Sequence, residues 1–140
     1  MVHKKPLKAL LLAAGFGTRL GELTKKSPKC MMKIGDKPLL GLWLEKLEDL
    51  GCQEVLVNTH YLADQVESYI NSFNKLSMKV SLAHEKLLLG TACTLLVNKE
   101  TFRNSEVLFI HADNFTNLNF ENFIEAHHKR NTDSLMSMVT

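Results

Sequence analysis

Two glycines and two basic residues near the N-terminus have the chemistry to bind phosphate. The segment reads Gly15-Phe16-Gly17-Thr18-Arg19, and Lys29 follows farther along the same expected loop. Glycine lets the backbone approach a ligand closely, so that successive N–H groups can surround phosphate oxygens. Arg19 offers a planar fork of donors, and Lys29 offers a mobile point charge. Together these residues could neutralise a triphosphate and the negative charge that spreads during phosphoryl transfer.

Two common phosphate-binding motifs do not match this loop. A P-loop ends in Gly-Lys-Ser/Thr, and that ending does not occur in the sequence. The dinucleotide fingerprint GxGxxG requires glycine at position 20, where this chain has Leu20, and a helix directly after it. Here a basic, proline-containing loop follows instead. Gly-x-Gly after a strand is also compatible with an ordinary tight turn, so the downstream Thr-Arg and Pro-Lys pairs carry the argument for phosphate binding.

Apolar runs of strand length alternate along the chain with segments of helical periodicity. We expect strands at residues 8–14, 54–58, 79–84, 106–111 and 134–140. We expect helices at residues 39–50, 62–73, 91–98 and from 120 onward, the last one capped by Asn119. This alternation implies right-handed βαβ units, and hence a three-layer α/β fold with a mostly parallel sheet. Residues 1–140 are expected to belong to a single domain.

Three loops are expected to meet at one edge of this sheet. In a parallel α/β sheet, ligands bind beyond the carboxyl ends of the strands. The loops at those ends are residues 15–29, 84–91 and 111–115, and all three are rich in glycine or polar residues. We therefore expect the functional site where they converge.

The bulk composition favours a soluble globular protein. Of 140 residues, 45% are apolar and 23% are charged. A net charge of +2 is too small to favour nucleic acid or an anionic membrane as a partner. The apolar run at residues 9–14 is too short for a signal peptide, and no segment approaches the length of a transmembrane helix. Three cysteines without a CxxC pair make a disulfide framework unexpected and indicate a cytoplasmic protein.

The N-terminal segment LLAAGFGTRLGELTKKSPKCMMKIGDKPLL resembles the signature of the sugar-phosphate nucleotidylyltransferases. That signature is an apolar strand, then AAGxGTRL, a short basic loop, PK and a KPLL helix start. The resemblance implies a Rossmann-like parallel sheet and a glycine loop that wraps a nucleotide. It also implies that Arg19 and Lys29 are the catalytic cations that clamp the phosphates. The nucleotide-binding residues expected in this first segment are Leu12, Ala13, Ala14, Gly15, Gly17 and Thr18.

A second segment, HEKLLLGTACTL, resembles the family sequence EPxLLGTAGAL, which contacts the nucleobase. The resemblance adds Glu85, Gly90 and Thr91 to the expected nucleotide-binding residues. The chain has Lys86 where proline is usual and Cys93 where glycine is usual, which leaves the base contacts open. Thr91 could alternatively serve only as the cap of the following helix.

Asp113 is the expected metal ligand. It follows the strand expected at residues 106–111, in a segment His111-Ala112-Asp113 that resembles the family's Gly-Asp pair. A carboxylate at a strand end suits Mg²⁺, which prefers hard oxygen ligands and usually takes only one or two from protein. The alternative for Asp113 is a turn-forming role.

VNTHYLADQVE, at residues 57–67, resembles the same region of the mannose-1-phosphate guanylyltransferase-like members of the family. Asn58 or His60 could face the site, but we expect a helix-capping or turn role for them instead.

The expected reaction transfers a nucleoside monophosphate from a nucleoside triphosphate to a sugar 1-phosphate, giving a nucleotide sugar and pyrophosphate. The attacking phosphate is already anionic, so the protein's task is positioning and charge stabilisation. Two alternatives stay open: a non-catalytic nucleotide-binding regulatory subunit, and a cytidylyltransferase acting on a small phospho-alcohol. The sequence leaves the nucleobase and the sugar undetermined.

Family members of this type continue well beyond residue 140, with the sugar-binding residues and a second metal-binding aspartate in their later half. In this chain residues 134–140 are expected to form a buried strand at the very end. We therefore expect a C-terminally truncated domain that binds a triphosphate weakly and forms no nucleotide sugar alone. An exposed sheet edge should favour self-association.

Overall fold

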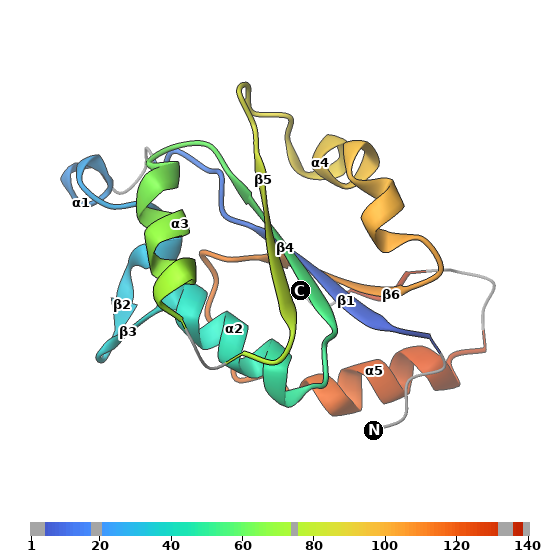
Figure 1. Ribbon diagram of the computed structural model, residues 1–140. Helices are drawn as coiled ribbons and strands as arrows, with labels where there is room; N and C mark the ends of the chain where they lie inside the picture. Colours follow the sequence, from blue (N-terminus) through green and yellow to red (C-terminus); the bar gives the residue numbers. More distant parts are fainter. Residues whose placement is uncertain (1–4, 18–20, 74–75, 132–135, 139–140) are drawn as a thin grey trace.

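The computed structural model describes residues 5–17, 21–73, 76–131 and 136–138. Its main sheet has four parallel strands in the order β5-β4-β1-β6 (Figure 1). The strands are β1 (Leu7–Leu12), β4 (Glu54–Thr59), β5 (Lys79–His84) and β6 (Glu106–His111). The expected parallel α/β sheet is therefore confirmed, and β5 and β6 have the bounds that the sequence indicates.

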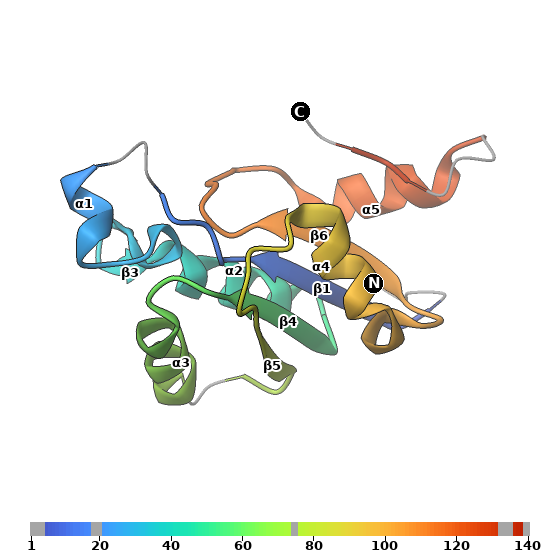
Figure 2. The same ribbon diagram turned by 90° about the horizontal axis from the view of Figure 1, so that it is seen from above.

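Helices cover both faces of this sheet and make the third layer. Those packed on one face are α2 (Leu39–Asp49), α3 (Ala63–Ser72) and α5 (Phe120–Lys129). On the other face lie the short helix α4 (Thr91–Val97) and the 3-10 helix η3 (Lys99–Phe102). Figure 1 shows α2 and α5 below the sheet and α4 above it, and Figure 2 shows α4 in front of the strands.

The inner strand β1 is buried on both faces because all of its residues except Lys8 are apolar. Leu7, Ala9 and Leu11 point into the larger core beneath α2, whereas Leu10 points to the smaller core beneath α4 and η3. All four are at most 2% exposed. This two-sided burial fixes β1 firmly, and the glycine loop begins at its carboxyl end.

The larger core is completed by α2 and α5. Leu40, Leu44 and Leu47 recur at helical spacing on α2, and each is 0% exposed. Trp43 meets Phe120 of α5 edge-on, with ring centroids 5.7 Å apart. Asn119 caps α5 as expected, because its Oδ1 accepts a hydrogen bond from the Asn122 amide at 2.8 Å.

The segment between β1 and α2 contains more structure than the single loop expected there. It includes the one-turn helix α1 (Glu22–Lys25), the 3-10 helix η2 (Lys29–Met31) and an antiparallel hairpin of β2 (Lys33–Ile34) and β3 (Lys37–Pro38). These elements are too short to show periodicity in the sequence. They are nevertheless important, because η2 begins at Lys29.

The strand expected at residues 134–140 is wrong within the part that the structure describes. Residues 136–138 adopt no strand conformation, and Met136 and Met138 are 74% and 76% exposed. Between them, the Ser137 hydroxyl lies 2.8 Å from Nδ1 of His127 on α5. The segment therefore contacts α5 rather than adding to the sheet, and the remaining residues of this range lie outside the description.

Two further expectations concern the surface. Phe109 on the edge strand β6 is 42% exposed, and the expected self-association stays a prediction. Within the described residues, no helix has the length and apolar character needed to cross a membrane.

Candidate functional site

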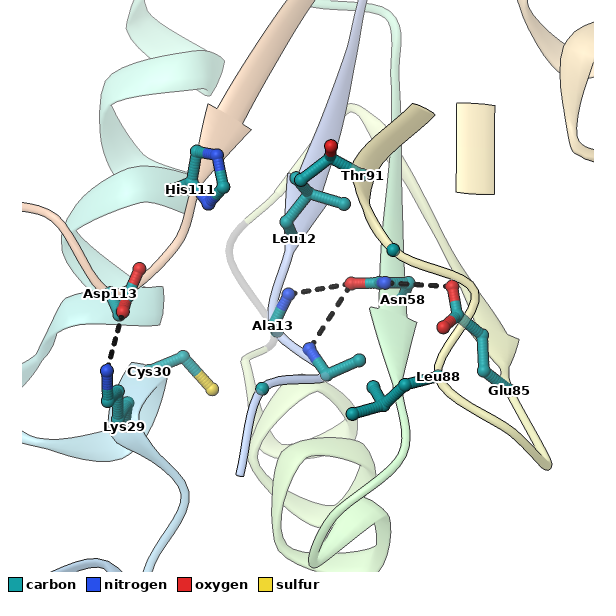
Figure 3. A pocket seen from close by; sticks show the side chains of 13 residues that line it. Leu12, Ala13, Lys29, Cys30, Asn58, Glu85, Leu88, Thr91, His111 and Asp113 are labelled. Atoms are coloured by element: carbon teal, nitrogen blue, oxygen red, sulfur yellow. Dashed lines mark hydrogen bonds and ion pairs between the residues drawn. The ribbon is translucent and has the colours of Figure 1, made fainter. Parts of the chain in front are cut away.

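A cavity of about 260 Å³ opens at the carboxyl ends of the parallel strands (Figure 3). The loops that follow β1, β5 and β6 contribute to its walls, as the strand-end rule predicts. Its lining residues are Leu12, Ala13, Ala14, Gly15, Lys29, Cys30, Asn58, Glu85, Leu88, Gly90, Thr91, His111 and Asp113.

Most of the residues proposed from the sequence line this cavity. Gly17 is not among them, and Thr18 and Arg19 lie outside the described residues. Sequence reasoning did not propose three of the lining residues, Cys30, Leu88 and His111, and it preferred a capping or turn role for a fourth, Asn58. The strand-end rule could have indicated Asn58 and His111, since each is at or next to the last residue of a strand.

Lys29 and Asp113 form an ion pair at one side of the cavity (Figure 3). Lys29 Nζ lies 3.3 Å from Asp113 Oδ2, and the two side chains are 21% and 32% exposed. The Trp43 indole N–H donates to the Asn114 carbonyl at 2.9 Å, which anchors the loop that carries Asp113. The contact with Trp43 holds the loop of Asp113 in place, while both side chains of the ion pair stay partly exposed to solvent and accessible to a ligand.

Gly17 does not line the cavity, but its lack of a side chain affects the position of Lys29, which does. It has φ of 69°, and a Cβ atom there would lie 2.7 Å from Thr24 Cγ2 and 2.8 Å from Lys29 Cγ. The buried Thr24 hydroxyl donates to the Gly17 carbonyl at 3.0 Å. The glycine therefore gives the Lys29 side chain the space it needs to reach Asp113.

The basic segment is also tied to α3 and the turn before it. Tyr61 Oη donates to the Lys25 carbonyl at 3.2 Å, and Gln65 Nε2 donates to the Lys26 carbonyl at 2.9 Å. Phe16 packs edge-on against His60, with ring centroids 5.1 Å apart. The glycine loop and the segment leading to Lys29 thus both pack against residues 60–65.

On the opposite wall, Asn58 joins the glycine loop to Glu85. Its Oδ1 accepts from the Ala13 amide at 2.7 Å and from the Ala14 amide at 3.3 Å. Its Nδ2 donates to Glu85 Oε1 at 2.9 Å. The expected capping role is wrong for Asn58 and His60, because α3 is preceded by Leu62 and has no side-chain cap.

Glu85 is an anionic group that is held from several sides. Burial raises the pKa of its carboxyl, but hydrogen bonds from Asn58, Thr94 and the Leu89 amide outweigh this and leave the pKa below its ordinary value. His60 Nδ1 lies 2.6 Å from the Glu85 carbonyl oxygen. The cavity therefore contains a fixed negative charge on the wall opposite Lys29.

Cys30 lines the cavity as an unreactive thiol. It is 1% exposed, and burial raises its pKa to about 12. Burial likewise raises the pKa of Cys52 to about 11, whereas Cys93 on α4 is exposed. Since the thiolate is the nucleophile, neither buried cysteine can react readily near neutral pH.

We expect a thiol reagent to distinguish these three cysteines. At about pH 8, Ellman's reagent should modify Cys93 in the native protein and leave Cys30 and Cys52 unmodified, because their thiols are buried and protonated. In denaturant all three thiols should react. Rapid native modification of Cys30, located by peptide mass spectrometry, would contradict the closed cavity wall.

The described residues contain no cluster of three or more His, Cys, Asp or Glu side chains placed to hold a metal ion. Asp113 could supply one carboxylate ligand, and its Oδ1 accepts no hydrogen bond from the described residues. One protein carboxylate is compatible with Mg²⁺ because that ion commonly takes its remaining ligands from substrate phosphates and water.

Comparison with known proteins agrees with this geometry. The nucleotidyl transferase family pattern matches residues 8–140. The chain is 35% identical over 124 residues to mannose-1-phosphate guanyltransferase beta-B of Xenopus laevis, which covers 86% of this chain and 34% of that protein. The chain thus spans about a third of the length of the curated relatives it matches.

Solved structures show the same fold and a similar division of length. HddC from Yersinia pseudotuberculosis superimposes with a TM-score of 0.76 at 30% identity, covering 87% of this chain and 54% of that one. The same protein is also known in complex with GMP-PN. CTP:phosphocholine cytidylyltransferase from Streptococcus pneumoniae gives a TM-score of 0.65 at 30% identity, covering 81% of this chain and 48% of that one. With a family match from residue 8 to residue 140, this chain belongs to the nucleotidyl transferase family.

Proposed function

We propose that this chain is the nucleotide-binding part of a sugar-1-phosphate nucleotidylyltransferase. The observation that carries the proposal is the Lys29–Asp113 pair, 3.3 Å apart, in a cavity bordered by the glycine loop. A cation there can hold the phosphates of a nucleoside triphosphate. The similarity to a mannose-1-phosphate guanyltransferase over 86% of this chain supports the same reaction class.

In the proposed reaction, an oxygen of the sugar 1-phosphate attacks the α-phosphorus of the triphosphate. A new P–O bond forms, the bond to the β-phosphate oxygen breaks, and pyrophosphate leaves with the electron pair. No protein nucleophile is needed, because the attacking oxygen is already anionic. Lys29 stabilises the charge that develops on the phosphates, and it does so best if held in place before reaction. Arg19 is proposed to act with Lys29 as the second cation.

Magnesium is proposed as the cofactor, with Asp113 as a ligand. The single accessible carboxylate fits a site completed by the triphosphate and water. The ion would reduce the charge repulsion between the phosphates and the incoming anion. Because Asp113 Oδ2 lies close to Lys29 Nζ, the carboxylate is near the cation that we propose binds the phosphates, so a metal ion held there could also contact them.

Guanine is the base that we propose, on two grounds. The curated relative is named a guanyltransferase, and HddC has been solved with GMP-PN. In addition, the pKa of the Glu85 carboxyl lies below its ordinary value, which favours the ionised form, and among the described residues the Leu89 amide alone donates to Oε2, so this oxygen can accept a further hydrogen bond. The Watson–Crick edge of guanine presents N–H donors that such an acceptor suits.

A cytidylyltransferase acting on a small phospho-alcohol is the second candidate. It is favoured by the 30% identity to the Streptococcus pneumoniae phosphocholine enzyme. The two candidates differ in the nucleotide that they require, so binding experiments separate them. A regulatory subunit, in contrast, would bind the nucleotide but would not transfer it to a sugar phosphate or to phosphocholine.

The proposed function is tested by isothermal titration of the 140-residue chain with GTP, UTP, CTP and ATP, each with magnesium chloride. We expect GTP to bind most tightly. Preferential binding of CTP would replace the proposal by the second candidate, and failure of all four nucleotides to bind would overturn both. Pyrophosphate release with mannose 1-phosphate or phosphocholine present, measured on a longer version of the protein that includes the sugar-binding residues, then separates an enzyme from a regulatory subunit.

We expect Asp113→Asn to reduce the contribution of magnesium to GTP binding. The amide keeps the size of the side chain but removes the negative charge, so the affinity gained by adding magnesium should fall about tenfold. Titration of GTP with and without magnesium chloride measures the effect. An equal magnesium dependence in both proteins would mean that Asp113 has only a turn-forming role.

A further inference from the structure

Asn58 lies at the point where the β1–β4 ladder ends. The last paired residues of the two strands are Leu12 and Asn58, so the amides of Ala13 and Ala14 extend past the ladder. The Asn58 side chain takes over as their acceptor, at 2.7 and 3.3 Å. Asn58 is 3% exposed, and these bonds satisfy amides that would otherwise be costly to bury.

The same side chain reaches the opposite wall of the cavity. Its Nδ2 donates to Glu85 Oε1, which also accepts the Thr94 hydroxyl of α4. Glu85 Oε2 accepts the Leu89 amide at 3.1 Å. An amide side chain can accept on one side and donate on the other, which is what this position requires. Figure 3 shows Asn58 between Ala13 and Glu85.

We infer that Asn58 is a positioning residue that sets the start of the glycine loop against Glu85 and the β5–α4 loop, and thereby shapes the cavity for a nucleotide. This inference rests on the proposed function for its ligand, but the hydrogen-bond network itself does not depend on any ligand. The Ala13 and Ala14 amides are already used within the protein. The backbone donors offered to a nucleotide therefore begin at Gly15, not at Ala13.

The decisive variant is Asn58→Asp, which keeps the acceptor and removes the donor. At about pH 8 the two carboxylates at positions 58 and 85 repel each other, so GTP affinity should fall about tenfold. At lower pH the pair can share one proton, and the hydroxyl so formed donates across the gap as the amide did. Affinity should therefore recover towards that of the wild-type protein as the pH falls to about 5.5.

A double variant provides the rescue. In Asn58→Asp with Glu85→Gln, the new amide donates to the new carboxylate, and the Ala13 and Ala14 amides keep their acceptor. GTP affinity at about pH 8 should be clearly higher than in Asn58→Asp alone, but it should stay below that of wild type, because the glutamine at position 85 lacks the charge of Glu85 and its amide nitrogen cannot accept the Thr94 hydroxyl. His60, whose Nδ1 contacts the Glu85 carbonyl oxygen, is the titratable group nearest to this network. Lys29, Asp113 and His111 also line the cavity, and because they and His60 are present in every variant, each affinity is compared with that of the wild-type protein at the same pH.

Asn122→Asp is the matched control, because it makes the same chemical change at an exposed position on α5. Its GTP affinity should equal that of the wild-type protein at both pH values. Circular dichroism of each variant checks the fold. If the single variant is unfolded at about pH 8, a folded double variant that binds GTP supports the inference, and an unfolded double variant overturns it.

Amide hydrogen exchange of Ala13 and Ala14, followed by NMR without nucleotide, separates this inference from the proposed function. Exchange should be faster in Asn58→Ala, which removes the acceptor, than in wild type, and it should stay slow in the double variant, which keeps the acceptor. Failure of the wild-type protein to bind GTP would overturn only the proposed function. Unchanged exchange in Asn58→Ala, unchanged GTP affinity in Asn58→Asp, or absence of rescue by the double variant would each overturn the positioning role.

Discussion

Replacing Lys29 with methionine is expected to lower nucleotidyl transfer about a hundredfold or more. Methionine has a similar length but no charge, so the change removes the cation that lies 3.3 Å from Asp113, where we propose that the phosphates bind. A cation aimed at charge that develops during transfer acts mainly on the transition state. Turnover should therefore fall much more than the affinity for GTP. Pyrophosphate release measures the first quantity, and calorimetry measures the second.

Lys33→Met is the matched control for this experiment. Lys33 lies on β2, a few residues beyond Lys29, and is exposed. Removing its charge changes the net charge of the protein by the same amount but leaves the cavity intact. Equal turnover by Lys29→Met and Lys33→Met would refute the role of Lys29. The measurement needs a version of the protein that turns over, whereas the loss of GTP affinity can be followed with the 140-residue chain.

Gly17→Ala is expected to have the second largest effect, with GTP affinity reduced about thirtyfold. A Cβ atom at this position would lie 2.8 Å from Lys29 Cγ and 2.7 Å from Thr24 Cγ2, in a backbone conformation with φ of 69°. The loop must shift or the lysine must move, and strain of this kind costs about 1–3 kcal/mol. The affinity falls mainly because the shifted glycine loop alters the cavity wall at Gly15, and the displacement of Lys29 from Asp113 adds to this loss. Titration with GTP and magnesium measures the change.

Gly51→Ala separates strain from displacement of the lysine. Gly51 also has a positive φ, of 74°, but a Cβ atom there would meet nothing within 4 Å. It follows α2, away from the cavity. This variant should lose about 1 kcal/mol of unfolding free energy in urea through backbone strain and keep its GTP affinity. If Gly17→Ala resembles Gly51→Ala in both measurements, the contact with Lys29 has no functional consequence.

The sequence by itself determined the architecture, because the strands and helices are long enough for their periodicity to report burial. The apolar run at residues 8–14 predicts a buried strand, and β1 is one of the two inner strands of the sheet. Residues 79–84 and 106–111 were assigned as strands with the bounds that the structure has. Parallel strands place their carboxyl ends together, so the convergence of the glycine loop with Glu85 and Asp113 followed from topology. The resemblance in the glycine loop added the family, which the comparisons confirm.

The tertiary structure alone decided which polar groups meet and in which pairing. Lys29 and Asp113 are 84 positions apart, and Ala13 and Asn58 are 45 apart, so no local pattern reports their contact. The role of Asn58 depends on the β1–β4 register that ends at Leu12, and a shift by one residue would turn its side chain to the other face. Residues 136–138 failed to form a strand for a related reason. An apolar run joins a sheet only where it packs against an available edge, and here Ser137 contacts His127 of α5 instead.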